Sequence, residues 1–351
     1  PKESDKLANN KIQSIQQEII WRTEQMYRMK QVRHQAWPKR SLPEGTKIDV
    51  DKKYNAYLNE LEPLLEHDAN TVKQWLDLNP DAPLISIIVP TYNTNSTHLR
   101  ECIESVRRQL YQKWELCICD DCSTETHVQN ILKDYQSKDH RIKIVLRERN
   151  GHICEASNNA LSLATGEYVA LLDHDDILAE NALYWVAREL QKRPYANLVY
   201  SDEDKIDDFG ARSCPHFKPA YNLDLLLSYN FISHLGVYRR DVLTKIGGFR
   251  AGLEGSQDHD LALRTILESS SDQIIHIPRV LYHWRAHSES TASTPDSKDY
   301  TTQSGLKAVQ HYLDEQHRRS GVQAKAAIQA KNRFFCQWQI PEEQPSVELI
   351  I

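Results

Sequence analysis

Three carboxylates stand close together in the stretch Asp173-His174-Asp175-Asp176, directly after the apolar run 168–172. Such a run is typical of a buried strand. Neighbouring carboxylates repel one another, and withdrawing them from water is costly unless a cation or hydrogen-bond donors compensate. Mg²⁺ and Mn²⁺ favour oxygen ligands, so such a cluster can hold a diphosphate through a divalent cation. We therefore expect a cation site here; three solvated loop carboxylates are the alternative.

Strand and helix patterns alternate around this cluster. Continuous apolar runs predict strands buried on both faces at 84–90, 114–119, 142–146 and 168–172, and helical patterns lie between them. This alternation predicts an α/β fold with a doubly wound, mostly parallel sheet, flanked by N-terminal and C-terminal helical extensions. Ligands of such sheets bind beyond the carboxyl ends of the strands.

Polar groups follow each of these strands, and the predicted topology gathers them in one crevice. They are Pro90-Thr91-Tyr92-Asn93, Asp120-Asp121, Asn150-Gly151 and the acidic cluster. Neither a G-x-G-x-x-G motif nor a P-loop follows the first strand. The crevice is therefore acidic, and we expect it to reach a diphosphate through a metal ion.

The composition is that of an ordinary globular protein, with 40% hydrophobic and 26% charged residues. The net charge of -6 argues against a nucleic-acid partner. No apolar run approaches the roughly 20 residues of a membrane span, and residues 1–30 are too polar for a signal peptide, so we expect a cytoplasmic location. The odd number of cysteines, seven, favours reduced core thiols; a metal site in "CICDDC" (117–122) is the alternative.

Five segments resemble, in order, the motifs of family-2 glycosyltransferases with the GT-A fold. They are "SIIVPTYN", "CDDCST", "LLDHDD", "GGF" and "EGSQDHDL", and the resemblance extends from residue 84 to about residue 294. It implies a metal-dependent, inverting transfer of a sugar from a nucleotide-diphosphate donor, a UDP- or dTDP-sugar, with Mn²⁺ or Mg²⁺ as cofactor. The motif style resembles bacterial O-antigen and capsule enzymes. It implies a glycan or lipid-linked glycan acceptor and a peripheral position at the inner face of the cytoplasmic membrane.

The same resemblance implies roles for individual residues. Asp175 and His287 would hold the metal. The residues implied to bind the nucleotide sugar are Pro90, Tyr92, Asp121, Asn150, Asn158 and Asp173. For Asp121 the alternative is a cap of a strand-end turn, and we expect Asp176 to cap a following helix.

The implied catalytic base is Asp258, within Gln257-Asp258, where the family has a Glu-Asp pair. Displacing a nucleoside diphosphate requires a base that takes the proton of the acceptor hydroxyl. Asp260 is the alternative, although it lies two positions further along the predicted helix and points to another side. A further acidic stretch, "YSDEDKID" (200–207), would line a sugar or form a solvated turn.

The chain divides into five predicted parts. We expect an amphipathic helical arm over 1–40, a linker and helical segment over 41–82, the glycosyltransferase domain over 83–295 and a C-terminal helical extension over 296–340. The arm is expected to mediate self-association or docking. Residues 345–351, "PSVELII", resemble residues 83–93, so residues 341–351 are expected to begin a second domain; an edge strand of the same domain is the alternative.

Two other functions remain open at this point. A metal-dependent nucleotidyltransferase also uses clustered carboxylates, but residues 90–98 lack its Gly/Arg/Lys-rich phosphate loop. A non-catalytic nucleotide-sugar-binding scaffold would tolerate the loss of Asp175 or Asp258, and both residues are present. The sequence therefore favours the glycosyltransferase.

Overall fold

A nine-stranded sheet forms the centre of the protein, with the strand order β3-β2-β1-β4-β8-β6-β9-β5 and with β7 paired to β6. The structure is a computed structural model, and it describes residues 54–62, 69–286 and 298–339. The first half of the sheet is parallel and comprises β1 (Ile85–Thr91), β2 (Trp114–Asp120), β3 (Ile142–Leu146) and β4 (Tyr168–Leu171). The sequence-based prediction of a parallel α/β sheet is confirmed.

The second half of the sheet is mixed. β8 (Gly236–Arg239) runs antiparallel to both of its neighbours, whereas β6 (Leu198–Ile206) and β9 (Ile274–Arg285) are parallel to each other. Two short antiparallel strands complete it, β7 (Arg212–His216) on β6 and β5 (Ile177–Leu178) on β9.

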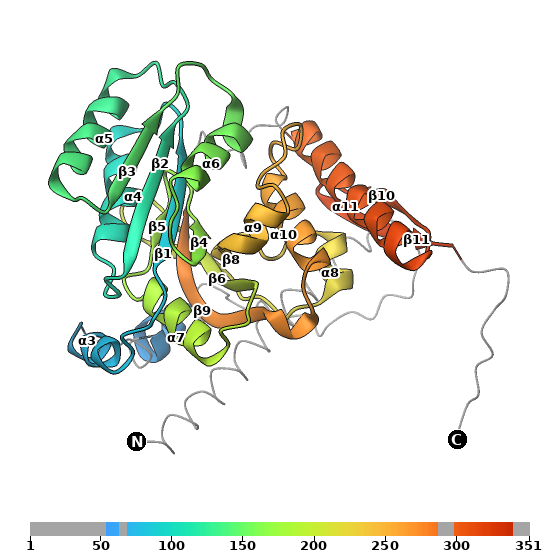
Figure 1. Ribbon diagram of the computed structural model, residues 1–351, viewed down its shortest axis with the longest axis horizontal. Coiled ribbons are helices and arrows are strands. Elements are labelled where there is room, and N and C mark those ends of the chain that lie inside the picture. The colour runs from blue at the N-terminus through green and yellow to red at the C-terminus, as the bar shows by residue number, and fades with distance from the viewer. Residues whose placement is uncertain (1–53, 63–68, 287–297, 340–351) are drawn as a thin grey trace, which may run out of the picture.

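Helices cover both faces of the sheet (Figure 1). One apolar core contains residues of α4 (Ser96–Arg107), α5 (Thr126–Lys138) and α7 (Ala182–Lys192). The core on the other face contains residues of α6 (His152–Ser162), α8 (Leu223–Ser228), α9 (Arg240–Lys245) and α10 (Gln257–Leu267). The sheet is therefore doubly wound, as predicted.

Side-chain alternation explains the continuous apolar runs and the cysteines. Along β2, Leu116 and Ile118 point into one core, while Cys117 and Cys119 point into the other. The cysteines of the described residues are free thiols, and both of these are fully buried. The interpretation as reduced core cysteines is confirmed for Cys117 and Cys119.

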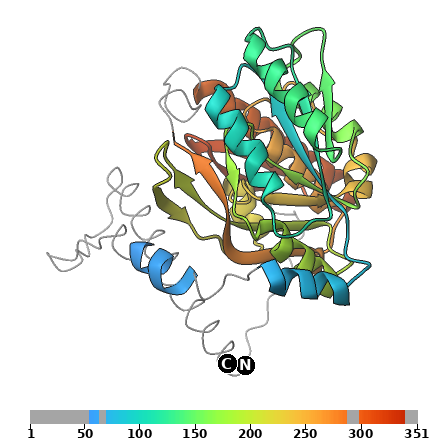
Figure 2. The same ribbon diagram turned by 90° about the vertical axis from the view of Figure 1, so that its left-hand side faces the viewer.

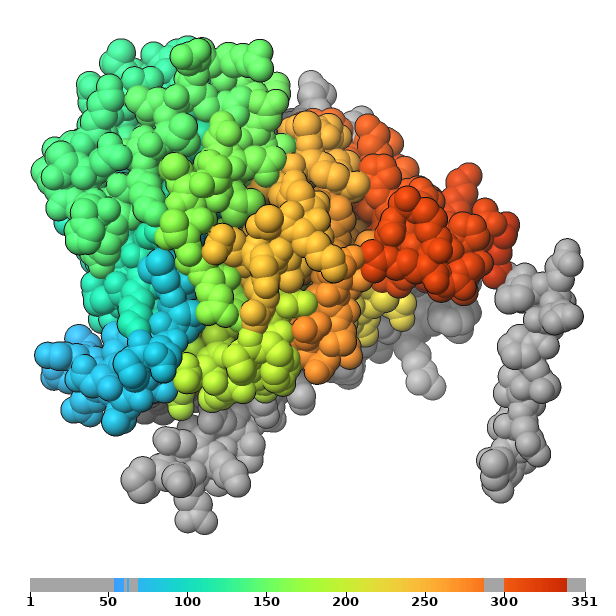
Figure 3. Space-filling view, in the orientation of Figure 1, coloured from blue at the N-terminus to red at the C-terminus, as the bar shows by residue number. Residues whose placement is uncertain are grey.

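The C-terminal region is not helical throughout. α11 (Lys298–Ser320) packs on α10, but an antiparallel hairpin of β10 (Ala324–Ala330) and β11 (Arg333–Trp338) follows it. Phe334 of this hairpin is buried, and a Cβ on Gly305 of α11 would lie 2.6 Å from its ring. Close packing on α11 thus holds the hairpin, which stands out from the α/β body in Figure 3.

Two segments precede the sheet, η2 (Tyr57–Leu61) and α3 (Ala69–Leu78). Tyr54 and Tyr57 pack against Phe217, beside the β6–β7 hairpin in Figure 2. The predicted arm, the predicted second domain and His287 lie outside the described residues. Within the part of the chain that the structure describes, no helix is both long and apolar enough to cross a membrane.

Candidate active site

The acidic turn, residues 173–176, follows β4 and is held to β9 by hydrogen bonds. Asp176 is 1% exposed and accepts hydrogen bonds from the Tyr282 hydroxyl at 2.5 Å and the Arg285 backbone N–H at 2.7 Å. The Asp173 backbone N–H donates to the same hydroxyl. The expected helix-capping role of Asp176 is wrong, because the short strand β5 intervenes and α7 begins only at Ala182.

Arg285 supports the backbone of the turn. Its guanidinium is 2% exposed, donates to the Asp175 carbonyl at 2.8 Å and pairs with Glu101 at 2.5 Å. Its cationic head is therefore used on the carbonyl and on α4. The carboxylates of Asp173 and Asp175 stay closer to solvent, with side chains 45% and 22% exposed.

His234 is the histidine that the structure brings to this turn. Its Nε2 lies 4.0 Å from Asp173 Oδ2, and its ring stacks on Tyr282 with the centroids 4.5 Å apart. One ligand atom each from Asp173, Asp176 and His234 lie within 4.8 Å of one another. Two carboxylates and an imidazole suit a divalent cation, so these residues fit a metal site.

The sequence did not single out His234, because no spacing in "NFISHLGV" connects it to the acidic turn. Asp175, the predicted ligand, lies in the turn, but the three-residue group contains Asp176 in its place.

Crowding of negative charge alters the acidity of the turn. Partial burial raises the pKa of Asp173, His234 opposes this, and the charge of Asp175 adds to it. Burial also raises the pKa of Asp176, with further contributions from Asp173 and Asp175. A bound cation would favour the ionised forms of both groups.

The predicted nucleotide side is built where β1, β2 and β3 end. Asp121 is buried, accepts the Gly151 N–H at 3.0 Å and pairs with Arg147 Nε at 2.9 Å. Asn150 donates to the Asp121 carbonyl at 3.1 Å. The structure thus brings Asp121 and Asn150 together, although the contact to Gly151 also fits the turn-capping alternative.

Two other predicted nucleotide residues come from the end of β1. Pro90 is buried in β1, and Tyr92, just beyond the strand, is 44% exposed. Asn93 Oδ1 accepts from the backbone N–H of Thr124 at 2.8 Å, which joins the ends of β1 and β2. The Tyr92 ring is therefore accessible on a fixed strand end.

Asn158 makes a different contact from the predicted one. Its Oδ1 accepts from the Phe249 N–H and its Nδ2 donates to the Phe249 carbonyl, both at 2.8 Å. Its side chain therefore holds the "GGF" turn to α6. At Gly248, φ is +64° and a Cβ would lie 2.4 Å from Asn158 Oδ1, which explains the glycine.

Asp258 and Asp260, the two candidate bases, differ sharply in their surroundings. Asp260 is 1% exposed and pairs with Arg250 and with Arg264, the latter at 2.8 Å. Asp258 is half-buried and accepts a hydrogen bond of 2.7 Å from the neutral amide of Asn230. Residues 230–234 link this carboxylate to the acidic turn, because Asn230 donates to Asp258 while His234 Nε2 lies 4.0 Å from Asp173 Oδ2.

The acidic stretch 202–204 lies inside β6 and is buried, so it is not a solvated turn. Its carboxylates have partners of opposite charge or N–H donors. Asp202 contacts His276 at 2.8 Å, Glu203 contacts Lys218 at 3.3 Å, and Asp204 pairs with Arg212 at 2.6 Å. These pairs join β6 to its surroundings.

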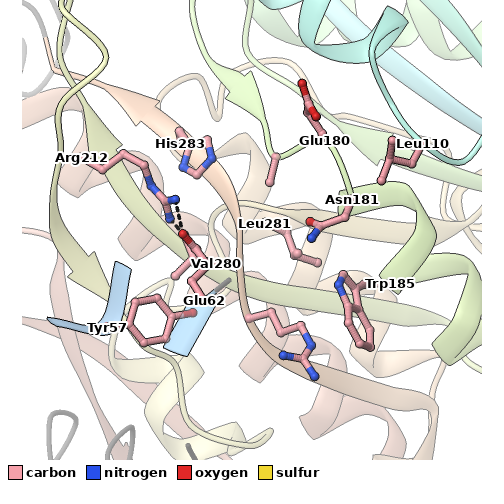
Figure 4. A pocket seen from close by; sticks show the side chains of 12 residues that line it. Tyr57, Glu62, Leu110, Glu180, Asn181, Trp185, Arg212, Val280, Leu281 and His283 are labelled. Atoms are coloured by element: carbon pink, nitrogen blue, oxygen red, sulfur yellow. Dashed lines mark hydrogen bonds and ion pairs between the residues drawn. The ribbon is translucent and has the colours of Figure 1, made fainter. Parts of the chain in front are cut away.

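A cavity of about 220 Å³ lies on the other side of β9 (Figure 4). Leu281 and His283 of β9 line it, together with Tyr57, Trp185 and Arg212. Side chains alternate along a strand, so Leu281 and His283 point away from the face on which Tyr282 meets the acidic turn. None of the predicted site residues lines this cavity.

The chain is similar in sequence to known glycosyltransferases. The sequence profile of glycosyl transferase family 2 matches residues 86–247. O-antigen biosynthesis protein RfbC of Myxococcus xanthus is 36% identical over 252 residues, which are 72% of this chain; the chain spans only 20% of that relative's length. The uncharacterized glycosyltransferase MJ1057 of Methanocaldococcus jannaschii is 31% identical over 201 residues, or 56% of this chain and 69% of the relative.

A similar solved structure is that of the mannosyltransferase PcManGT from Pyrobaculum calidifontis in complex with GDP-Man and Mn²⁺. Its TM-score is 0.50 at 19% identity, and the match covers 71% of this chain and 70% of that chain. This likeness concerns the fold. The matching profile and the identity to MJ1057 lead to one conclusion: the chain belongs to glycosyltransferase family 2.

Proposed function

We propose that the chain is a metal-dependent, inverting glycosyltransferase. It moves a sugar from a nucleotide-diphosphate donor to a glycan hydroxyl in the synthesis of a surface polysaccharide. One observation carries this proposal: residues 230–234 join Asp258, which has no ion pair to a lysine or arginine of the described residues, to the group of possible metal ligands around Asp173. The relative named for O-antigen biosynthesis and the structural neighbour with GDP-Man and Mn²⁺ support it.

In the proposed reaction Asp258 takes the proton of the acceptor hydroxyl as that oxygen attacks the sugar carbon. The bond to the departing diphosphate breaks on the opposite side, so a single displacement inverts the configuration. A divalent cation, Mn²⁺ or Mg²⁺, would supply charge stabilisation for the departing diphosphate. Asp173, Asp176 and His234 fit as its holders, with Asp175 and His287 as the residues that the resemblance implied.

The donor and the acceptor belong to the same proposal. Tyr92 offers an exposed ring for stacking on a nucleobase, and the Asp121 N–H donates to the carbonyl of the preceding residue, Thr91, at 2.8 Å, so a UDP- or dTDP-sugar is the proposed donor. The proposed acceptor is a glycan or lipid-linked glycan at the inner face of the cytoplasmic membrane. Residues 1–40 would serve self-association or docking there.

A ligand panel tests the proposal. UDP-, dTDP- and GDP-sugars are added with Mn²⁺ or with EDTA, while thermal unfolding and release of free nucleoside diphosphate are measured. A donor at 100 times its dissociation constant should add about 2.7 kcal/mol to the free energy of unfolding. This gain should need the metal, and Asp258→Asn should retain it while losing turnover. Absence of both stabilisation and release across the panel would contradict the proposal.

A further inference from the structure

The loop between α8 and β8, residues 229–235, carries side chains to both ends of the site. Asn230 donates to Asp258, and His234, four residues later, lies beside Asp173. Neither Asn230 nor His234 is among the site residues predicted from the sequence. We propose that Asn230 is the positioning residue of the catalytic base: it fixes one oxygen of Asp258 and leaves the other for the acceptor hydroxyl. This inference rests on the proposed function.

The contact between Asn230 and Asp258 has a defined direction. Asn230 Nδ2 donates to Asp258 Oδ2 at 2.7 Å, whereas Asn230 Oδ1 accepts the Ser233 backbone N–H at 3.2 Å. The second bond fixes the amide orientation, because a flipped amide would turn an N–H toward the Ser233 N–H. The donor is thereby aimed at Asp258 before any substrate binds.

A buried ion pair holds this loop in place. Lys218 is 1% exposed, and its ammonium donates to the carbonyls of Ile232 and His234 while it lies 3.3 Å from Glu203. Glu203 in turn accepts the His234 backbone N–H at 3.0 Å. The Lys218–Glu203 pair therefore fixes the backbone that presents Asn230 and His234.

The charge of the hydrogen-bond donor that holds a carboxylate affects how well this carboxylate can act as a base. Asp260 is held by two arginines, and charged donors of this kind form stronger hydrogen bonds than a neutral amide does. A neutral amide fixes the rotamer with a smaller effect on basicity. On α10, the neutral donor to Asp258 therefore suits a base, whereas the two arginines at Asp260 suit a structural ion pair.

Other titratable groups also face Asp258, and any pH test must take them into account. They are Asp173 of the acidic turn, His259 of the same helix, Tyr238 of β8 and Cys154 of α6. A substitution at Asn230 removes none of these groups, and Asn230→Ser adds no charge of its own, so the pH profile of Asn230→Ser reports on the loss of the Asn230–Asp258 contact.

The test compares Asn230→Asp and Asn230→Ser with Asn197→Asp. Asn197 is also buried and donates through its amide, to Ser269 at 3.0 Å, but it is not part of the site. Initial rates of nucleoside diphosphate release are measured from pH 5 to 9 with the donor found in the ligand panel, and UDP affinity is measured by calorimetry. Both Asn230 variants should lower kcat by roughly 10- to 100-fold with unchanged UDP affinity.

Asn230→Asp should in addition move the acid limb of the pH profile upward by about one unit, because a second carboxylate disfavours the ionised base. Asn197→Asp should lower Tm without moving that limb. A folded Asn230→Asp protein with the wild-type kcat and limb would overturn the inference. If Asp258→Asn itself keeps its turnover, the proposed function fails instead.

Carboxyl-carbon NMR of aspartate-labelled protein gives a readout that needs no donor. The Asp258 signal is identified by its loss in Asp258→Asn, and its titration midpoint should rise in Asn230→Asp but not in Asn197→Asp. An unchanged midpoint would overturn the inference even if the donor remained unidentified.

Discussion

The acidic turn 173–176 and the acidic strand segment 202–204 have similar compositions and opposite surroundings. In the strand segment, Lys218, Arg212 and His276 approach the carboxylates to within 3.3 Å. In the turn, no lysine or arginine of the described residues forms an ion pair with Asp173 or Asp176, and Arg285 binds a backbone carbonyl instead. Buried carboxylates with cationic partners stabilise the fold, whereas the turn retains negative charge that a cation can use.

The same contrast recurs within α10. Asp260 forms ion pairs with two arginines, while Asp258 is only partly buried and accepts a hydrogen bond from the neutral amide of Asn230. The charge state of the partner, more than the acidity of the sequence, therefore distinguishes a structural carboxylate from a reactive one.

The largest expected effect separates Asp258 from Asp260. Asp258→Asn should lower the transfer rate by roughly 10²–10⁴-fold, the usual contribution of a general base, with donor affinity near normal. Asp260→Asn should mainly lower the free energy of unfolding, because Arg250 and Arg264 lose a charged partner. Steady-state kinetics and urea unfolding of both variants check this. If Asp260→Asn is the more damaging change for kcat in a folded protein, the assignment of the base is wrong.

The next largest effect separates the strand segment from the turn. Asp204→Ala should lower the free energy of unfolding by roughly 3 kcal/mol, since Arg212 and His283 lose a buried acceptor. Asp173→Ala should leave that free energy unchanged or raise it, because the partly exposed carboxylate of Asp173 has no ion pair to a lysine or arginine of the described residues and repels Asp175 and Asp176. Urea titrations in EDTA measure both. A large loss in Asp173→Ala would remove the distinction between the two acidic regions.

A metal titration sharpens the assignment within the turn. His234 belongs to the ligand group, whereas His174, which lies 3.7 Å from Asp175, does not. Mn²⁺ at 100 times its dissociation constant should stabilise the wild type by about 2.7 kcal/mol. His234→Ala should lose most of this gain in a thermal-shift assay, and His174→Ala should keep it. The reverse order would exclude His234 as a ligand.

The smallest expected effect is a pH dependence. Despite burial, Lys218 and the hydrogen bond from His216 hold the pKa of Glu203 well below its usual range. A lowered carboxylate pKa gives stability that is present above the unfolded-state value, near 4.5, and is lost as the pH falls toward the folded-state value. Glu203→Gln should therefore flatten the dependence of the unfolding free energy between pH 5 and 3. An equally steep acid loss in Glu203→Gln would assign that dependence to other groups.

Much of the parallel half-sheet could be predicted from the sequence, because β1 and β2 are buried on both faces and leave uninterrupted apolar runs. The role of Asp176 could not be predicted, because β5 follows it in place of a helix. A strand of two residues shows no alternation of apolar and polar side chains that would reveal it in the sequence. The partners of the β6 carboxylates could not be predicted either, because Lys218, Arg212 and His276 lie at separate positions in the sequence. His234 reaches the site only through the position of β8 in the sheet.

The alternation of side chains along β2 has a practical consequence for measuring how the protein opens. A thiolate reacts with alkylating reagents and a thiol does not, and burial raises the pKa of Cys117 and Cys119 to about 12. Cys214 on β7, by contrast, is exposed. After the accessible thiols are blocked, the rate at which Cys117 and Cys119 are labelled measures how often β2 becomes exposed to solvent, and no engineered probe is required.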